Sequence, residues 1–446
     1  MNRVHQKSKW SVGLRQIRAS VIVAACSLTW TLTLSAPVGS STPGTMCGNV
    51  AVPIQIGGQS GAIAGTLCSP PGATTIQLLI PGWTYNRSYW SVPYQPATYS
   101  YVSAANSAGY ATLAIDRLGS GRSLHPLSLF DTMQADVSSV HSVVTALRNG
   151  SLGNRYSQII EVGHSLGSIV AADEAGIYHD VNALITTGYS HSLNYTNAYI
   201  EIAGHDYLAM GDPKFANLGL DPLYLTSEPG TRGLFNYAPN TDRAILGLDE
   251  TLLKDVDNLI EGATIATYPI DNVDRTLNIP VLDVTGDHDA IFCGLNTASC
   301  TSSQALARFE QSFYGPKATV KAFLVPNSGH DVNLEKSAPL SYAHMIGFSN
   351  QFIGYGTGEL GSASGVQPLP STPPQGSPSL AATLANQALI KAVKPLADAY
   401  MTAIRPIPGL GTQNDPNPLA ALFLAQMGDL VNELLSALPV QLLSGA

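Results

Sequence analysis

The sequence predicts an α/β fold with a mostly parallel central sheet that helices cover on both faces. Short β-rich runs alternate with helical stretches from Val50 onward, which is the pattern of consecutive strand–helix–strand units. The chain has 446 residues, of which 45% are hydrophobic and only 12% charged. Such a composition favours a large folded core over a disordered chain.

Eight β-rich runs are the candidate strands of this sheet. They span residues 50–56, 62–68, 75–80, 111–116, 158–162, 183–187, 281–285 and 320–325. Helical periodicity is clearest over 129–147, where Val137, Val140, Val144 and Leu147 recur at spacings of three and four. This order of elements predicts helices in the connections between parallel strands.

Residues 1–41 have the layout of a secretory signal peptide. Five basic residues, all before position 19, precede an apolar run over 19–36 that ends near small residues. We expect cleavage after Ala36 or a few residues later, and therefore a secreted protein. An uncleaved membrane anchor is the alternative, because the apolar run is about as long as a short membrane span.

The charge of the chain argues against two classes of partner. The formal net charge is -9, and it becomes -14 without the five basic residues of the leader, because all 31 acidic residues lie beyond position 41. Nucleic acid and anionic membrane would be poor partners for a surface of that sign.

Four cysteines remain beyond the leader, namely Cys47, Cys68, Cys293 and Cys300. An even number in an exported chain predicts two disulfides, and four cysteines permit three pairings. Local pairing is the simplest: Cys47 with Cys68, and Cys293 with Cys300. Zinc binding is the rival interpretation, but the sequence has no CxxC pair and no clustered histidines to support it.

About 90 residues separate the strand that ends near Thr187 from the strand that begins near Val281, far more than a connecting loop needs. We expect a cap insertion over about 190–278 that shapes access to the sheet, or else an insertion without that role. Residues 248–260 are predicted to be helical. Glu201, His205 and Asp206 match no metal motif, and they are predicted to be solvated cap residues.

The composition changes after residue 355. Residues 356–379 are rich in Gly, Pro and Ser, which is typical of a linker. Two apolar helical patterns follow within 380–446 and predict a helical C-terminal extension. We expect this extension to pack on the main domain rather than to bind a membrane or a partner.

A candidate nucleophile lies in the pentapeptide at residues 163–167, Gly-His-Ser-Leu-Gly. This motif follows a β-rich run and precedes a helical start, the context in which Gly-x-Ser-x-Gly forms a nucleophile elbow. The two glycines suit a tight turn whose flanking elements approach closely. Ser165 would then stand at the start of the helix as the nucleophile, and an ordinary glycine-flanked turn is the alternative.

A serine nucleophile needs a base, and the base needs a carboxylate that orients it. His330 follows the last predicted strand and Asp289 follows the strand before it, so the chain order is Ser, Asp, His. Asp287 is the runner-up for the acid, since it lies earlier in the same turn. His288 is a poorer candidate base than His330, because it would share one short turn with the carboxylate.

An oxyanion hole needs two backbone N–H groups that point at the developing charge. Leu166, the residue after the nucleophile, is expected to supply one of them. Trp83 is the candidate for the other, because Pro81 and Gly82 follow an apolar strand and Gly82 would let the Trp83 N–H turn inward. A plain Pro-Gly turn is the alternative.

These motifs resemble those of the α/β-hydrolase superfamily, in particular exported esterase-like and lipase-like serine hydrolases with a cap insertion. The resemblance includes the segment 81–86, Pro-Gly-Trp-Thr-Tyr-Asn, and the loop 116–123. It implies an α/β-hydrolase domain over 47–355 with a Ser–Asp–His triad and a lid. In place of the common His-Gly start of the oxyanion loop, this chain has Pro81 and Gly82.

A serine at the elbow implies acyl transfer, here hydrolysis of a carboxylic ester through an acyl-enzyme without a metal or an organic cofactor. Trp83, Tyr85, Tyr89 and Trp90 lie beside the proposed oxyanion loop and favour a small apolar ester, although the same rings would also pack beneath a cap. The alternatives are a peptidase or amidase with the same triad and a non-catalytic protein that binds an apolar ligand. We expect no stable membrane insertion after cleavage of the leader, and the sequence leaves the oligomeric state open.

Overall fold

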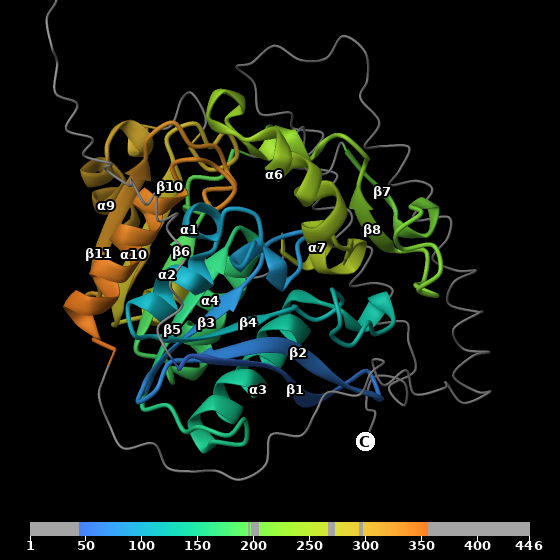
Figure 1. Cartoon of the computed structure of the whole chain (residues 1–446), viewed down its shortest axis with the longest axis horizontal. Coiled ribbons are helices and arrows are strands. Elements are labelled where there is room, and N and C mark those ends of the chain that lie inside the picture. Colours follow the sequence, from blue (N-terminus) through green and yellow to red (C-terminus); the bar gives the residue numbers. More distant parts are fainter. Residues whose placement is uncertain (1–43, 195–196, 198–204, 266–272, 294–297, 356–446) are drawn as a thin grey trace, which may run out of the picture. The chain divides into compact units, whose positions relative to one another are not determined.

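The structure, a computed structural model, describes residues 44–194, 197, 205–265, 273–293 and 298–355 (Figure 1). The predicted leader (1–41), linker (356–379) and C-terminal extension (380–446) lie outside the described residues, as does Glu201. Within the described ranges, no helix is both long enough and apolar enough to cross a membrane.

The chain forms an eight-stranded sheet in the order β1-β2-β4-β3-β5-β6-β10-β11 (Figure 1). Strand β2 pairs antiparallel with both of its neighbours, and the pairs from β4 to β11 are parallel. The strands are β1 (Met46–Ile56), β2 (Gln59–Ser69), β3 (Thr75–Ile80), β4 (Ala111–Ile115), β5 (Gln158–His164), β6 (Ala183–Thr187), β10 (Pro280–Gly286) and β11 (Thr319–Val325). The predicted α/β class and its mostly parallel sheet are therefore confirmed.

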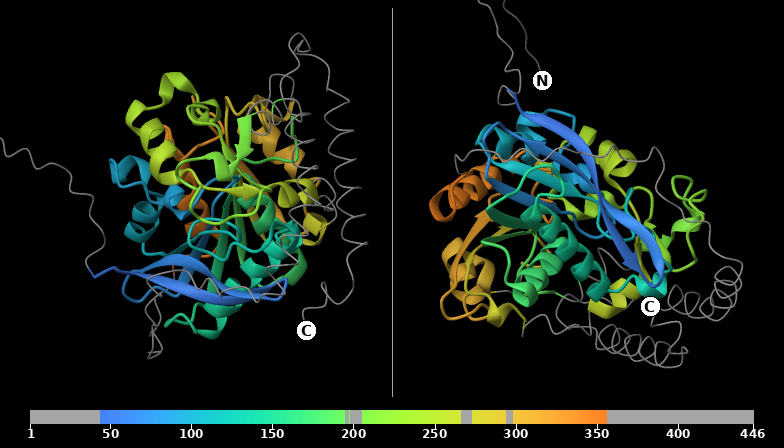
Figure 2. Two further views of the ribbon diagram at one scale, coloured as in Figure 1. Left: turned by 90° about the vertical axis from the view of Figure 1, so that its right-hand side faces the viewer. Right: turned by 90° about the horizontal axis from the view of Figure 1, so that it is seen from below.

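Helices cover both faces of this sheet, which explains why its inner strands are apolar on both sides. Every residue of β3, β4 and β6 is buried. Figures 1 and 2 show the helices around the sheet, and the apolar cores place α3 and α4 on one face and α2 and α10 on the other. The helices outside the insertion are α1 (Pro96–Tyr99), α2 (Tyr101–Ser107), α3 (Met133–Asn149), α4 (Leu166–Tyr178), α9 (Ser303–Glu310) and α10 (Ala338–Phe352).

The helix predicted over 129–147 begins later, at Met133. The hydroxyl of Thr132 accepts a hydrogen bond from the N–H of Ala135 at 3.2 Å, which caps the helix at this position. Residues 128–130 form a separate 3₁₀ turn. The helix ends before Gly150, whose φ of 82° suits glycine at a helix end.

Residues 205–265, called here the insertion segment, form a second sheet of three antiparallel strands together with two helices (Figure 1). These elements are β7 (Asp206–Leu208), β8 (Tyr224–Ser227), β9 (Asp257–Asn258), α6 (Arg243–Leu248) and α7 (Leu259–Ile265). The Asp255 N–H donates to the Thr84 carbonyl at 2.8 Å, and the Asn86 N–H donates to the Leu253 carbonyl at 3.2 Å. The insertion segment thus contacts the loop that follows β3.

The prediction of one helix over 248–260 is wrong. Helix α6 ends at Leu248, a π-helical turn continues to Leu253, and the chain is extended at β9 before α7 begins. Asp255 accepts a hydrogen bond from the Gly121 N–H at 2.9 Å, and Asp257 accepts one from the Thr84 N–H at 2.6 Å. These bonds to distant loops hold the chain extended, and periodicity along the chain does not reveal them.

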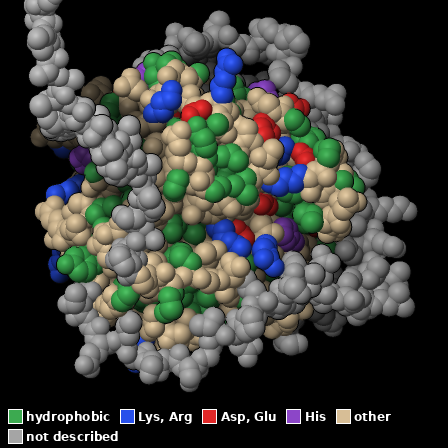
Figure 3. Space-filling model, in the orientation of Figure 1, with side chains coloured by type: hydrophobic (Ala, Val, Ile, Leu, Met, Phe, Trp, Pro, Cys, Tyr) green, Lys and Arg blue, Asp and Glu red, His purple; other side chains and the backbone are tan. Residues whose placement is uncertain are grey.

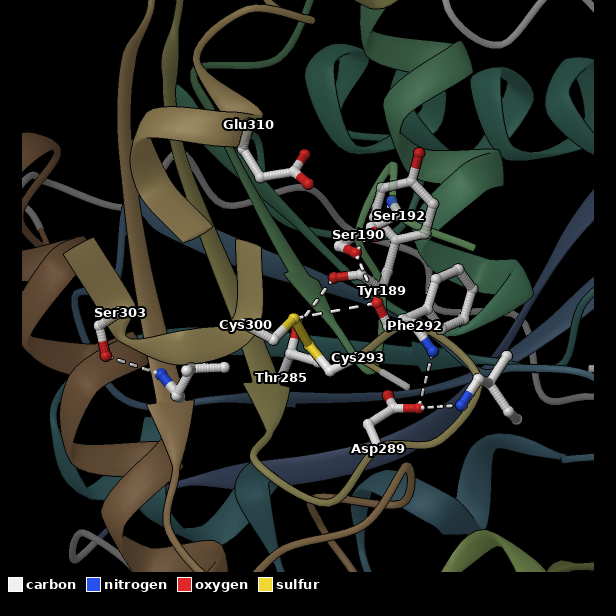
Figure 4. The surroundings of a disulfide bond; sticks show 12 residues. Tyr189, Ser190, Ser192, Thr285, Asp289, Phe292, Cys293, Cys300, Ser303 and Glu310 are labelled. Carbon is white, nitrogen blue, oxygen red and sulfur yellow. Dashed lines mark hydrogen bonds between the residues drawn. A yellow bond between two sulfur atoms is a disulfide. The ribbon is translucent and has the colours of Figure 1, made fainter. Parts of the chain in front are cut away.

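The structure contains two disulfides, and they are the local pairings favoured by the sequence. Cys47 and Cys68 are cross-strand partners in the register of β1 and β2. Cys293 and Cys300 are joined just after β10 (Figure 4). Each bridge therefore closes a short stretch of chain.

Candidate active site

Ser165 lies in a strained turn between the end of β5 and the first residue of α4. Its φ of 49° and ψ of -121° are values that residues other than glycine rarely adopt. The Ser165 N–H donates to the Thr187 carbonyl of β6 at 2.8 Å, and the Ser165 carbonyl accepts from the Ser168 N–H at 2.8 Å. These two bonds hold the turn, and the serine is only 6% exposed.

The glycines on either side of Ser165 are required by the backbone around them. A Cβ atom at Gly163 would clash with the Gly167 carbonyl, and one at Gly167 would clash with the carbonyls of Ile80 and Pro81. The pattern Gly-x-Ser-x-Gly therefore records how closely β5, α4 and the end of β3 approach one another.

His330 and Asp289 come together from the loops that follow β11 and β10. His330 Nδ1 lies 3.0 Å from Asp289 Oδ2, and both side chains are buried. The other oxygen, Asp289 Oδ1, accepts the N–H groups of Ile291 at 3.0 Å and Phe292 at 3.1 Å (Figure 4). The loop of Asp289 thus holds the carboxylate, and one oxygen faces the imidazole.

The other candidates in the same region have different partners. Asp287 Oδ1 lies 2.6 Å from His288 Nδ1, both side chains are partly exposed, and the His288 ring stacks on Tyr237. Asp283 is buried within β10 and accepts a hydrogen bond from the Thr186 hydroxyl at 2.6 Å. Neither Asp287 nor Asp283 is therefore placed to orient His330.

A second buried pair, His164 and Asp331, was not found from the sequence. His164 Nε2 lies 3.0 Å from Asp331 Oδ1, and Asp331 Oδ2 accepts a hydrogen bond from the Tyr85 hydroxyl at 2.6 Å. Burial lowers the pKa of His164, against the effect of the Asp331 hydrogen bond, which raises it. Because each residue adjoins a candidate catalytic residue in sequence, the pair ties the serine turn to the His330 loop.

His164, His330 and Asp331 have potential metal-ligand atoms within 4.8 Å of one another. The pairs His164–Asp331 and His330–Asp289 already involve these side chains. The His330 ring centroid lies 5.1 Å from that of His164, which places the imidazole beside the serine turn. The arrangement suits proton transfer better than it suits a metal.

The segment 81–86 lies against Ser165. A Cβ atom at Gly82 would lie 2.9 Å from the Ser165 Cβ, so only glycine allows this approach. The N–H groups of Thr84, Tyr85 and Asn86 donate to Asp257, Gly82 and Leu253 respectively. No described residue accepts a hydrogen bond from the Trp83 N–H.

Leu166 provides the second backbone group predicted for an oxyanion hole. It is the first residue of α4, where an N–H has no partner within the helix. No described residue outside the helix accepts its N–H either. Among the residues that the structure describes, neither the Leu166 N–H nor the Trp83 N–H therefore has a hydrogen-bond acceptor.

A buried ionic network joins the insertion segment to this loop. Arg232 donates to Asp249 Oδ1 at 2.9 Å and to the Thr84 hydroxyl at 2.6 Å. Asp257 accepts the Thr84 N–H at 2.6 Å and an Arg117 N–H at 2.6 Å, and Arg117 also pairs with two further carboxylates, Asp136 and Glu261. Thr84 has a positive φ of 53°, and this network holds it there.

Tyr85, Tyr89 and Trp90 are buried in the core, which fits the alternative that these rings pack inside the protein. One prediction about this region is wrong. Asp206 is buried rather than solvated, and it accepts a hydrogen bond from Trp83 Nε1 at 2.9 Å. Burial raises the pKa of Asp206 to about 7. This error arose because contacts between distant segments, which local composition does not report, bury Asp206.

Comparisons with known proteins agree with the fold. A family model described as "Alpha/beta hydrolase family" matches residues 77–343, more than half of the chain. No curated protein matches the chain.

Solved structures similar to the chain include DcsB in complex with its substrate analogue, with 17% identity and a TM-score of 0.47 over 69% of this chain and 99% of that one. Another is a monoacylglycerol lipase from Paleococcus ferrophilus, with 14% identity and a TM-score of 0.43 over 64% and 97%. A third is the esterase Pf2001 from Pyrococcus furiosus, with 14% identity and a TM-score of 0.42 over 69% and 93%. Likeness at these levels carries no argument about substrate.

Proposed function

This chain belongs to the alpha/beta hydrolase family, and from that premise we propose that it is a secreted serine hydrolase that cleaves carboxylic esters through an acyl-enzyme. One observation carries the proposal: the ring of His330, whose Nδ1 is 3.0 Å from a buried Asp289 carboxylate, lies 5.1 Å from the ring of His164, the residue directly before Ser165 and its strained turn. The two disulfides and the predicted leader support secretion, because disulfides persist in oxidising compartments.

In the proposed mechanism His330 takes the proton of the Ser165 hydroxyl as the serine oxygen attacks the ester carbonyl carbon. Asp289 orients the imidazole and stabilises its positive charge. The N–H groups of Trp83 and Leu166 hold the negative oxygen of the tetrahedral intermediate. The protonated His330 then donates its proton to the leaving alkoxide.

The second half of the cycle repeats this chemistry with water. His330 takes a proton from a water molecule, which attacks the acyl carbon bound to Ser165. Collapse of the intermediate releases the carboxylic acid and returns the proton to Ser165. An ester needs less assistance at this site than an amide, because an alkoxide leaves a tetrahedral intermediate more readily than an amine does.

The first test is labelling of the folded protein with a fluorophosphonate, followed by peptide mapping and hydrolysis of p-nitrophenyl esters of graded chain length. We expect one label, on Ser165, and measurable turnover. In Ser165→Ala both should be lost, with kcat/KM lower by more than about 10³-fold and an unchanged circular dichroism spectrum. The variant Ser151→Ala, at an exposed turn, is the matched control and should keep both.

Two outcomes would overturn the proposal. A folded wild-type protein that takes no label and turns over no ester would favour the non-catalytic ligand-binding alternative. Faster hydrolysis of p-nitroanilides than of esters with the same acyl group would favour an amidase or peptidase.

A further inference from the structure

A second cluster of ionisable side chains lies on the α3 and α4 face of the sheet, on elements that also support the serine turn. Glu161 comes from β5, His141 from α3 and Glu174 from α4, and Asp180 follows the end of α4. Glu161 alternates along β5 with residues on the opposite face, so its carboxyl group points toward these two helices. None of these residues takes part in the proposed reaction.

The potential ligand atoms of three of these residues are close together. His141 Nδ1 lies 2.9 Å from Glu174 Oε1 and 3.3 Å from Asp180 Oδ2, and the ligand atoms of all three lie within 4.8 Å of one another. Two atoms that each lie about 2.1 Å from a tetrahedral zinc ion are about 3.4 Å apart. The observed spacing therefore suits a single coordination sphere.

Glu161 adds an independent observation. Its side chain is fully buried, and neither of its carboxylate oxygens has a hydrogen-bond donor among the described residues. The Glu161 carboxyl group lies against that of Glu174, whose Oε2 atom is also buried without a donor in the described part of the chain. Two carboxylates cannot bond to each other unless a proton or a cation lies between them.

The charge balance of the cluster favours a divalent cation. Arg148 is the basic side chain beside it, and its guanidinium donates to the Asp180 carbonyl and to Asn182 rather than to the three carboxylates. If all three carboxyl groups are ionised and His141 is neutral, as metal ligands are, the cluster and this arginine together carry two negative charges, which one divalent cation balances.

We propose that His141, Glu174 and Asp180 bind one structural divalent cation of the zinc class, and that the buried Glu161 carboxylate beside Glu174 adds negative charge to the site. An imidazole nitrogen among the ligands favours zinc over calcium, which prefers six to eight oxygen atoms. The side chains of His141 and Asp180 are 30% and 29% exposed, so the ion has a path from solvent. The ion would cross-link α3 and the C-terminal part of α4. This proposal does not depend on the role of Ser165.

The test is zinc binding by the purified full chain after treatment with EDTA and dialysis. We expect one equivalent of Zn²⁺ by elemental analysis, a rise in Tm on adding Zn²⁺, and weak or no response to Ca²⁺. His141→Ala should weaken binding by at least about 100-fold, since it removes one of three protein ligands. Glu161→Gln should reduce the rise in Tm at a given Zn²⁺ concentration, because it removes a negative charge beside the ligands, while the metal-free variant stays folded because the amide keeps the volume of the side chain.

The matched control is His179→Asn, at an exposed histidine next to Asp180. Asparagine suits the positive φ of 54° at this position, and the variant should bind zinc like the wild type. Zinc binding that survives Glu161→Gln and His141→Ala but is lost in His179→Asn would show adventitious surface binding and overturn the site. A wild-type Tm that does not respond to Zn²⁺ would overturn it too, and a response to Ca²⁺ alone would overturn the assignment to zinc.

Discussion

At the scale of single residues, His330 and Asp331 are neighbours in sequence, but their side chains have different partners. His330 faces Asp289, whereas Asp331 bonds to His164 and Tyr85. Two histidine–carboxylate pairs thus lie side by side. The pair with His330 belongs to the loops after β10 and β11, and the pair with Asp331 anchors one of those loops to the serine turn.

The role of the acid is tested by a pair of matched variants. Asp289→Asn keeps the size of the side chain but removes the charge that orients His330, and we expect kcat/KM to fall by about 10³- to 10⁴-fold. Asp287→Asn changes a partly exposed carboxylate that pairs with His288, and it should stay within about threefold of the wild type. Ester hydrolysis measured at pH 8 compares them. A larger loss in Asp287→Asn would transfer the role to Asp287.

At the scale of elements, the insertion segment fixes the conformation of the loop after β3. Thr84 adopts a positive φ, its N–H is bound by Asp257, and its hydroxyl is bound by Arg232. A threonine in this conformation is strained, so contacts from elsewhere must stabilise it. The Trp83 N–H immediately precedes Thr84, and its direction therefore depends on residues more than 140 positions away in the chain.

A variant of the insertion segment tests this coupling. In Asp257→Asn the amide cannot accept hydrogen bonds from both Thr84 and Arg117 as the carboxylate does, so the loop should shift. We expect kcat to fall by about 10- to 100-fold with KM within about twofold, because the proposed Trp83 contact acts on the transition state. Steady-state kinetics well below the Tm would measure this split.

The control for that variant is Asp212→Asn. It removes the charge that pairs with Lys254 at 2.7 Å within the same insertion segment. The hydrogen bonds of the Asp212 side chain are made to Tyr207, Lys214 and Lys254 rather than to residues 81–86. It should lower the Tm but leave kcat near the wild-type value. Equal losses of kcat in the two variants would mean that the insertion segment acts through general stability alone.

At the scale of the whole molecule, acidic groups are distributed in two ways. Figure 3 shows acidic and basic side chains close together on one face. Other carboxyl groups are buried, and burial raises the pKa of Asp116 to about 6 and those of Asp206 and Glu335 to about 7. Each of these carboxyl groups binds a proton more readily in the folded chain than in the unfolded chain. The stability that this adds is fully present below about pH 4, the unfolded pKa, and is lost as the pH rises through the pKa of the folded chain.

Histidines set the range in which this effect is visible. Burial lowers the pKa values of His125 and His164. The contribution of these two histidines to folding stability therefore rises with pH up to about 6.5, and in that range it offsets the stability lost from the carboxyl groups. Although burial opposes it, bonding to Asp274 and Glu310 raises the pKa of His191 to about 10. The stability from His191 is therefore present below about pH 6.5 and is lost as the pH rises to about 10.

We therefore expect the Tm of the chain to fall between pH 6.5 and pH 9. Thermal unfolding followed by circular dichroism in EDTA, at constant ionic strength, measures this slope. The variant His191→Gln should be less stable than the wild type at pH 7 and should show a smaller slope above pH 8, where the wild-type contribution fades. A wild-type Tm that rises steadily from pH 6.5 to 9 would contradict the assignment.

Much of this architecture was predictable from local patterns. The inner strands are short apolar runs, because helices bury both faces of the sheet there. The glycines at 163 and 167 report how closely the backbone approaches around Ser165. The order of motifs also selected Asp289 and His330, which the structure brings together. Signals of this kind come from single segments, and the sequence by itself determined them.

Only the tertiary structure decided which buried polar groups meet. The break in the helix predicted over 248–260, the burial of Asp206 and the pair His164–Asp331 each depend on contacts between segments far apart in the chain. The cluster around Glu161 is of the same kind. Periodicity records whether a position is buried, but the partner of a buried charge is set by how the elements pack. Burying a charge without a partner costs a large free energy, so these pairings are part of what stabilises the fold.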